Sequence, residues 1–176
     1  MPTGLLLLLL LPVLGAGIIY NRLIRRRNLL REARSGVEVQ LKRRHDLIPN
    51  LVRVVKSYSD YEKNLLEEVT RARDICRRER SWPKKIEAEE GLSRGLKDLF
   101  AVAEAYPDLR ADQQFLKLQE NLVEVEDEIQ LARRYYNGTV RDLNILIESF
   151  PSRIIAFLFG FQEENYFQLK GGVNRP

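Results

Sequence analysis

Cysteine and histidine are nearly missing from this chain, which has one of each in 176 residues. One cysteine excludes an intramolecular disulfide and any Cys-based zinc or iron–sulfur site, and one histidine excludes a poly-His metal centre. The sequence also lacks a Glu-x-x-His pair, a phosphate-binding loop and a G-x-G-x-x-G motif. We therefore expect no catalytic residue, no metal and no cofactor, and we do not expect an enzyme.

Charge is absent from residues 2–21, which include a run of seven leucines at residues 5–11. About 20 apolar residues in a helix span the hydrocarbon core of a bilayer. A cleaved signal peptide is the alternative, but such a peptide starts with positive charge, and residues 1–4 contain no Lys or Arg. We predict an uncleaved transmembrane anchor over residues 1–21.

Arginines gather directly after this segment, at Arg22, Arg25, Arg26, Arg27, Arg31 and Arg34. The positive-inside rule then predicts a single-pass membrane protein with its N-terminus outside and its soluble domain in the cytoplasm. The same arginines are suited to anionic lipid headgroups. We expect no nucleic-acid partner, because aromatic residues are not interleaved with the basic ones and no nucleic-acid-binding motif is present.

Apolar periodicity predicts long helices in the rest of the chain. The clearest seam has spacings of three and four and consists of Phe115, Leu118, Leu122, Val125, Ile129, Ala132, Tyr136, Val140, Leu143, Ile147 and Phe150. A second face starts at the anchor and consists of Leu23, Leu30, Ala33, Val37, Leu41, Ile48, Val52 and Val55. Two shorter helices are predicted between them, with a capping box at residues 59–62 and Pro83 in a first turn. We expect Asp108 or Asp112 to cap the last helix.

No strand pattern is present, so we predict an all-α fold. It consists of an N-terminal transmembrane helix followed by an antiparallel up-and-down four-helix bundle with long first and last helices. The predicted domains are the anchor (1–21), the helical bundle (22–149), and an apolar C-terminal strap and tail (150–176). Residues 84–91 are charged and weakly patterned, so order is least expected there.

The few chemically reactive side chains have plain structural interpretations. We expect His45 to be exposed or to cap a kink at Pro49, where the helix loses a hydrogen-bond donor. We expect Cys76 to be an inert thiol on an apolar face. The acidic run at residues 120–128 is interpreted as a solvated helix face.

One set of polar residues allows two interpretations. Arg44 and Tyr136 fall on the apolar stripes, and a buried Arg needs carboxylate or carbonyl partners. The set forms either a polar network that fixes the register of the helices or a pocket for a partner. Its candidate members are Arg43, Arg44, Asp46, Asn50, Tyr106, Asp108, Arg133, Tyr136 and Asn137.

Aromatic residues crowd the C-terminal segment. In an antiparallel bundle this segment returns to the membrane-proximal end of the first helix. It then either folds back over the open end of the bundle or lies among lipid headgroups. In both cases we expect Phe159 and Phe161 to lie within one helix diameter of the first two turns after Tyr20. The predicted membrane-proximal residues are Arg22, Arg25, Arg26, Arg27, Phe150, Phe157, Phe159 and Phe161.

Four strings in order give the chain a specific resemblance. They are VQLKRRHDLIPNLVRVVKSY (residues 39–58), AVAEAYPDLRADQQFLKLQENL (101–122), ARRYYNGTVRDLN (132–144) and FPSRIIAFLFGF (150–161). With these strings the chain resembles the LemA family, bacterial proteins with a short N-terminal membrane segment and a helical domain. The resemblance implies a small helical bundle and no established catalytic activity or cofactor. It marks as family signatures Arg43, Arg44, Asp46, Pro49, Asn50, Tyr106, Pro107, Asp108, Phe115, Arg133, Tyr136, Asn137, Phe150, Pro151, Phe159, Gly160 and Phe161.

We therefore expect a membrane-anchored helical scaffold or interaction module of the bacterial cell envelope. Its expected partners are the lipid bilayer and another membrane or cytoplasmic protein. The alternative is a membrane-surface or lipid-remodelling protein that uses the basic collar and the aromatic C-terminal segment.

Overall fold

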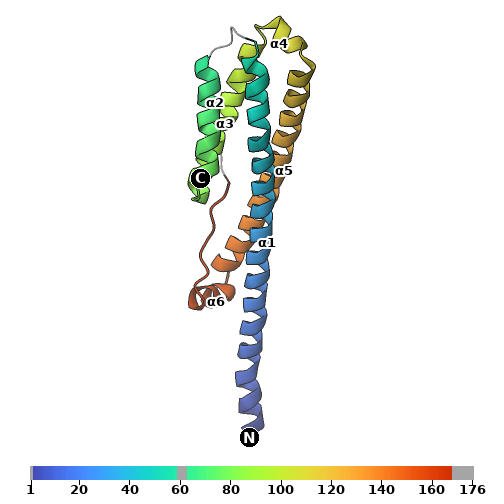
Figure 1. Cartoon of the computed structure of the whole chain (residues 1–176). Coiled ribbons are helices and arrows are strands. Elements are labelled where there is room, and N and C mark those ends of the chain that lie inside the picture. The colour runs from blue at the N-terminus through green and yellow to red at the C-terminus, as the bar shows by residue number, and fades with distance from the viewer. Residues whose placement is uncertain (1, 59–62, 168–176) are drawn as a thin grey trace, which may run out of the picture. The chain divides into compact units, whose positions relative to one another are not determined.

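The computed structural model describes residues 2–58 and 63–167, with side chains from residue 11 onward. This part of the chain is helical and contains no strand, which confirms the all-α class (Figure 1). The helices are α1 (Pro2–Lys56), α2 (Lys63–Arg78), α3 (Trp82–Ala103), α4 (Pro107–Ala111), α5 (Gln113–Glu148) and α6 (Ser152–Leu158). The up-and-down four-helix arrangement stays a prediction.

Among the described residues, no helix is both long enough and apolar enough to cross a membrane.

The leucine run that predicts the anchor lies almost entirely within residues 1–10, whose side chains fall outside the described part. The capping box predicted at residues 59–62 also falls outside it.

The chain divides into two compact units. Unit 1 combines Met1–Val37 with Ala132–Tyr166, and unit 2 combines Glu38–Leu131 with Phe167–Pro176. The helices α1 and α5 each contribute to both units. The predicted boundaries at residues 21 and 149 remain predictions.

Unit 1 buries the apolar stripes of α1 and α5 that their periodicity predicts. Its core consists of Leu23, Leu30, Ala33, Val37, Tyr136, Val140, Leu143, Ile147 and Ala156. On the flank of this core, the Arg26 guanidinium lies 3.1 Å from the Asp142 carboxylate and joins α1 to α5. Phe150, the last residue of the predicted seam, is exposed, because α5 ends at Glu148.

A glycine turns the chain at the end of α6. Gly160 has a φ of 69°, the left-handed conformation that glycine adopts at little cost. The Phe161 N–H donates to the Ala156 carbonyl and the Gly160 N–H to the Phe157 carbonyl, which is the Schellman pattern. The segment that follows runs back along α5, where the Asn144 amide donates to the Glu164 carbonyl and accepts from the Glu164 N–H. The segment predicted as an apolar strap therefore begins with the short helix α6 and continues, as far as Phe167, without regular structure.

Unit 2 has the larger core, contributed by α1, α2, α3, α4 and α5. Leu122, Val125 and Ile129 are buried there, as the seam predicts. At Gly95 on α3, an added Cβ would lie 3.4 Å from Val69 on α2, so these two helices pack in direct contact there.

The helix ends predicted in unit 2 are found at Asp112 and Pro83, and the structure adds one short helix. Asp112 caps α5, because its Oδ1 accepts hydrogen bonds from the N–H groups of Gln114 and Phe115. Pro83 lies in the first turn of α3. The short helix α4 was not predicted, although Pro107 suits the first turn of a helix.

Candidate functional site

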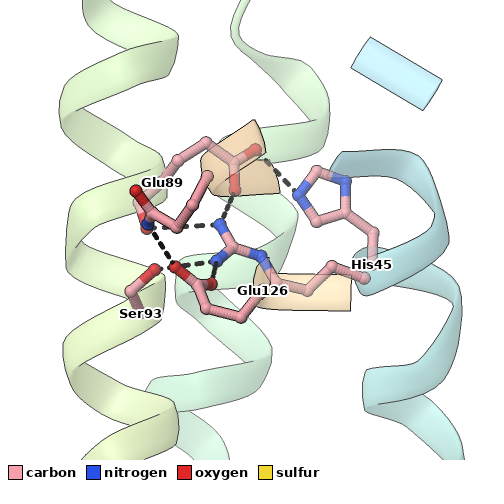
Figure 2. A network of polar contacts seen from close by, with 6 residues as sticks. His45, Glu89, Ser93 and Glu126 are labelled. Atoms are coloured by element: carbon pink, nitrogen blue, oxygen red, sulfur yellow. Dashed lines mark hydrogen bonds and ion pairs between the residues drawn. The ribbon is translucent and has the colours of Figure 1, made fainter. Parts of the chain in front are cut away.

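A charged network lies inside unit 2 and is centred on Arg44 of α1 (Figure 2). Its guanidinium Nη2 lies 2.5 Å from Oε2 of Glu89 on α3. Its Nη1 donates to the Ser93 hydroxyl at 2.7 Å and lies 2.8 Å from Oε2 of Glu126 on α5. The guanidinium therefore links α1 to both α3 and α5.

Glu89 is the hub of a second set of contacts. Its Oε1 lies 2.8 Å from Nε2 of His45, the residue next to Arg44 (Figure 2). The Cys76 thiol of α2 lies close enough for the negative charge of Glu89 to raise its pKa. The ligand atoms of His45, Cys76 and Glu89 all lie within 4.8 Å of one another, and all three residues are buried.

These surroundings set the charges in the cluster. Burial by itself would raise the pKa of Glu89, but the hydrogen bond from His45 and the charge of Arg44 outweigh burial and hold the pKa below its usual value. Glu89 is therefore a carboxylate. Burial, followed by the negative charge of Glu89, raises the pKa of the Cys76 thiol to about 12, so Cys76 is protonated at neutral pH.

A backbone hydrogen bond that α1 lacks is replaced by a side chain of α2. Pro49 has no N–H, so the carbonyl of His45, four residues earlier, has no partner within its own helix. Nε of Arg73 donates to this carbonyl at 2.9 Å. The helix α1 continues through Pro49 to Lys56.

The prediction that His45 is exposed or caps a kink is wrong. His45 is only 5% exposed, because α2 and α3 both pack on this part of α1 and widen its buried face. Residues 84–91, where order was least expected, form the first half of α3 and carry the buried Ile86 and Glu89. The prediction that Cys76 lies in the core is confirmed.

The other predicted residues of unit 2 lie away from this network. Arg43 pairs with Glu124 at 3.4 Å, and Asp46 pairs with Lys42 at 3.7 Å, both on the surface of the chain. Asn50 is exposed and lines a shallow groove of about 410 Å³ with Arg53 and Lys117, among others. Tyr106 precedes α4 and is half-buried, and Asp108 lies exposed in its first turn.

Arg133, Tyr136 and Asn137 belong to unit 1. Tyr136 is buried, as its place on the seam predicts, and its hydroxyl donates to the Asn165 carbonyl at 3.0 Å. Arg133 and Asn137 are half-buried. The predicted polar set is thus divided between the two units.

The predicted membrane-proximal residues all lie in unit 1, where two of them, Phe159 and Phe161, contact Tyr20 of α1. The rings of Tyr20 and Phe159 are 4.7 Å apart, and those of Tyr20 and Phe161 are 6.1 Å apart. The Arg27 guanidinium lies over the Phe161 ring at 4.9 Å. The expected closeness of Phe159 and Phe161 to the turns after Tyr20 is confirmed. Arg22, Arg25, Phe150 and Phe157 are exposed.

Sequence reasoning missed Glu89, Ser93 and the role of Glu126. A signal for Glu89 was present, because it lies three residues after Ile86 and three before Leu92 on the buried stripe of α3. Glu126 was interpreted as part of a solvated face, and it is in fact partly covered by its contact with Arg44.

Comparison with known proteins agrees with the resemblance in sequence. The LemA family profile matches residues 33–176. The magnetosome protein MamQ 2 of Paramagnetospirillum magneticum is 25% identical over 183 residues, which cover 89% of this chain and 67% of the relative. The magnetosome protein MamQ of Magnetospirillum gryphiswaldense is 23% identical with the same coverage. The protein LemA of Metamycoplasma hominis is 27% identical over 168 residues, 89% of this chain and 73% of the relative. Since the family profile covers most of its length, this chain belongs to the LemA family.

Proposed function

We propose that this protein is a membrane-anchored helical scaffold of the bacterial cell envelope, and that unit 1 is its bilayer-facing part. The observation that carries the proposal is the apolar outer surface of unit 1. On α1, Leu11 and Ile18 are 68% and 70% exposed, and on α6 Phe157 is 84% exposed. Such exposure of large apolar side chains is typical of a surface that meets lipid or another protein.

The apolar parts of α1 and α6 lie together, and basic residues border them. Phe159, the residue directly after α6, packs its ring on Tyr20 of α1. Arg22 and Arg25 are exposed in the next turns of α1. An apolar surface beside exposed arginines suits the boundary between acyl chains and anionic headgroups.

The proposed topology follows from the same charges. Residues 2–21 cross the bilayer with the N-terminus outside, and the residues from Arg22 onward lie in the cytoplasm. A fluorescent reporter that folds only in the cytoplasm, fused after Pro176, is expected to be active. Activity only of a reporter that requires the outer side would contradict this topology.

The proposal assigns no catalytic step to the chain. The cluster that contains a thiol and an imidazole is buried, and burial raises the pKa of Cys76 to about 12, which leaves the thiol protonated rather than nucleophilic. The proposed partners are the lipid bilayer and a second, membrane or cytoplasmic protein, with no nucleic acid among them.

Membrane extraction tests the anchor. Two charges placed in the apolar segment, Leu8→Arg with Leu14→Arg, are expected to release the protein into the soluble fraction during alkaline extraction. Asn28→Arg with Ser35→Arg, exposed positions farther along α1, is the matched control and is expected to remain with the membrane. Equal retention of both variants would contradict an anchoring role for residues 2–21.

The exposure of α6 favours a second candidate function, a membrane-surface or lipid-remodelling protein. The double variant Phe157→Ser with Leu158→Ser, at two exposed positions, distinguishes the two functions. If the double variant, with its anchor intact, no longer binds anionic vesicles or no longer changes their shape, lipid remodelling is favoured. If membrane retention and vesicle shape do not change, the scaffold function is favoured.

A further inference from the structure

Three buried side chains in unit 2 present three different kinds of metal ligand to one point. They are the imidazole of His45 on α1, the thiol of Cys76 on α2 and the carboxylate of Glu89 on α3. Their exposed fractions are 5%, 0% and 3%. One nitrogen, one sulfur and one oxygen thus lie within 4.8 Å of one another in a part of the core that is closed to solvent.

The distances show that these ligand atoms already lie close together. Nε2 of His45 lies 2.8 Å from Oε1 of Glu89 (Figure 2), and Sγ of Cys76 lies within 4.8 Å of the ligand atoms of both residues. Arg44 holds the other oxygen, Oε2. A metal ion that entered between His45 and Cys76 would therefore leave the ion pair between Arg44 and Glu89 in place.

The charges nearby decide which kind of ion fits. The positive groups that face the cluster are the guanidinium of Arg44 and that of Arg73, which binds the His45 carbonyl. A divalent ion that replaces the thiol proton adds one positive charge to this region, whereas a monovalent ion replaces the proton charge for charge. Thiolate is a ligand that selects soft ions such as Cu(I), and imidazole also suits copper.

We propose that His45, Cys76 and Glu89 form a buried binding site for one Cu(I) ion. The sulfur–copper bond forms as the thiol proton of Cys76 leaves to solvent. The proton of His45 moves from Nε2 to Nδ1, and Nε2 becomes the second ligand. Copper remains Cu(I) throughout, and the Glu89 carboxylate stays ionised beside Arg44 and supplies the third, weaker contact.

Only a small movement is needed to form this site. For zinc, metal–nitrogen and metal–sulfur bonds of ~2.0 and ~2.3 Å place the two ligand atoms at most about 4.3 Å apart, and comparable bonds serve here. The present ligand atoms are no more than 4.8 Å apart. The hydrogen bond between His45 and Glu89 lengthens as the ion takes the place of its proton.

A competition titration tests the site on the full chain in detergent micelles without oxygen. Cu(I) is supplied from a coloured Cu(I) chelator, and the loss of colour reports transfer to the protein. We expect one Cu(I) per chain. The X-ray absorption spectrum of the loaded protein is expected to show one sulfur and at least one nitrogen or oxygen neighbour.

A relocated thiol provides the matched control. The double variant Cys76→Ala with Ala72→Cys keeps one thiol in the partly buried position one turn earlier on α2. Loss of outer-shell groups alone costs ~10–100-fold in metal affinity, so the relocated thiol should weaken Cu(I) binding by at least about 100-fold. His45→Gln should weaken it as well, with Cys76 intact.

Equal Cu(I) affinity of the relocated-thiol variant and the unchanged chain would overturn the proposal, because the thiol alone would then be the site. If these variants fail to fold, the absorption spectrum of the unchanged chain still decides. Coordination by sulfur without a nitrogen or oxygen neighbour would overturn the proposal. None of these outcomes bears on the membrane anchor, because the site lies wholly within unit 2.

Discussion

The two units of this chain differ in the kind of polar group that each one buries. The buried polar side chains described in unit 1 are Thr139, Asn144 and Ser152, and those in unit 2 are Arg44, His45 and Glu89. The first three are neutral and bind backbone groups. The second three are ionisable and bind one another. A buried charge is costly without an opposite charge, so losing one partner should destabilise the core of unit 2 more than losing a neutral group destabilises unit 1.

The two units also differ in where their aromatic side chains lie. In unit 2, Trp82 packs on Phe167 and Phe100 on Phe115, with ring centroids 5.8 and 6.1 Å apart. In unit 1, Phe150 is 83% exposed. Unit 2 therefore uses its aromatic side chains to fill a core, and unit 1 leaves aromatic surface for a partner, which we propose is the bilayer.

The largest expected effect comes from breaking the charged core of unit 2. Glu89→Ala leaves the Arg44 guanidinium buried without one of its two carboxylate partners. Removing one partner of a buried ion pair costs about 3–5 kcal/mol. The free energy of unfolding, measured with denaturant, is expected to fall by this amount. Asn144→Ala in unit 1 is the neutral counterpart and is expected to cost only about 0.5–1.5 kcal/mol. Equal losses for both variants would remove the contrast between the two cores.

Apolar packing in unit 2 gives the next effect. Leu122→Ala removes a buried side chain, which typically costs ~2–5 kcal/mol of unfolding free energy. The matched control on the same helix is Leu131→Ala, because Leu131 is largely exposed. If calorimetry gave both variants the same thermal midpoint, the buried seam would not be the source of stability.

A double-mutant cycle tests how unit 2 tolerates a proline inside α1. Arg73→Met removes the donor to the His45 carbonyl, and Pro49→Ala supplies an N–H within the helix that binds the same carbonyl. Arg73→Met is therefore expected to cost about 0.5–1.5 kcal/mol more in the original chain than in the Pro49→Ala background. Additive losses in unfolding free energy would show that Arg73 does not replace the missing hydrogen bond.

The smallest effect concerns acid and the start of α5. The Tyr58 hydroxyl donates to Asp112 at 2.7 Å, and this hydrogen bond, followed by the one from the Phe115 N–H, lowers the pKa of Asp112. A lowered pKa stabilises the folded chain at pH values above the ordinary Asp pKa of ~3.9. This stabilisation disappears as the pH falls through the lowered pKa of Asp112. We expect the difference in thermal midpoint between the original chain and Asp112→Ala to be largest at neutral pH and to shrink in acid. A constant difference would exclude an ionised cap.

The sequence predicted those features that depend on one helix at a time. The seams of α1 and α5 are periodic, so Tyr136 and Arg44 were correctly placed on buried faces. The partners of Arg44 were not predicted, because pairing with Glu89 and Glu126 depends on how three helices pack. His45 was placed wrongly for the same reason, since the width of a buried face depends on the number of neighbouring helices.

The central claim is that unit 1 contacts the bilayer, and the environment of Phe157 tests it most directly. In a Cys76→Ser background, Phe157→Cys carries a nitroxide label, and the full chain is placed in bilayers that contain anionic lipid. The exposed Ile75 of unit 2, changed to Cys in the same background, is the control. The account predicts that the label at 157 is relaxed more by oxygen, which concentrates in lipid, than by a water-soluble nickel chelate, with the reverse at 75. The same preference for the nickel chelate at both positions would contradict it.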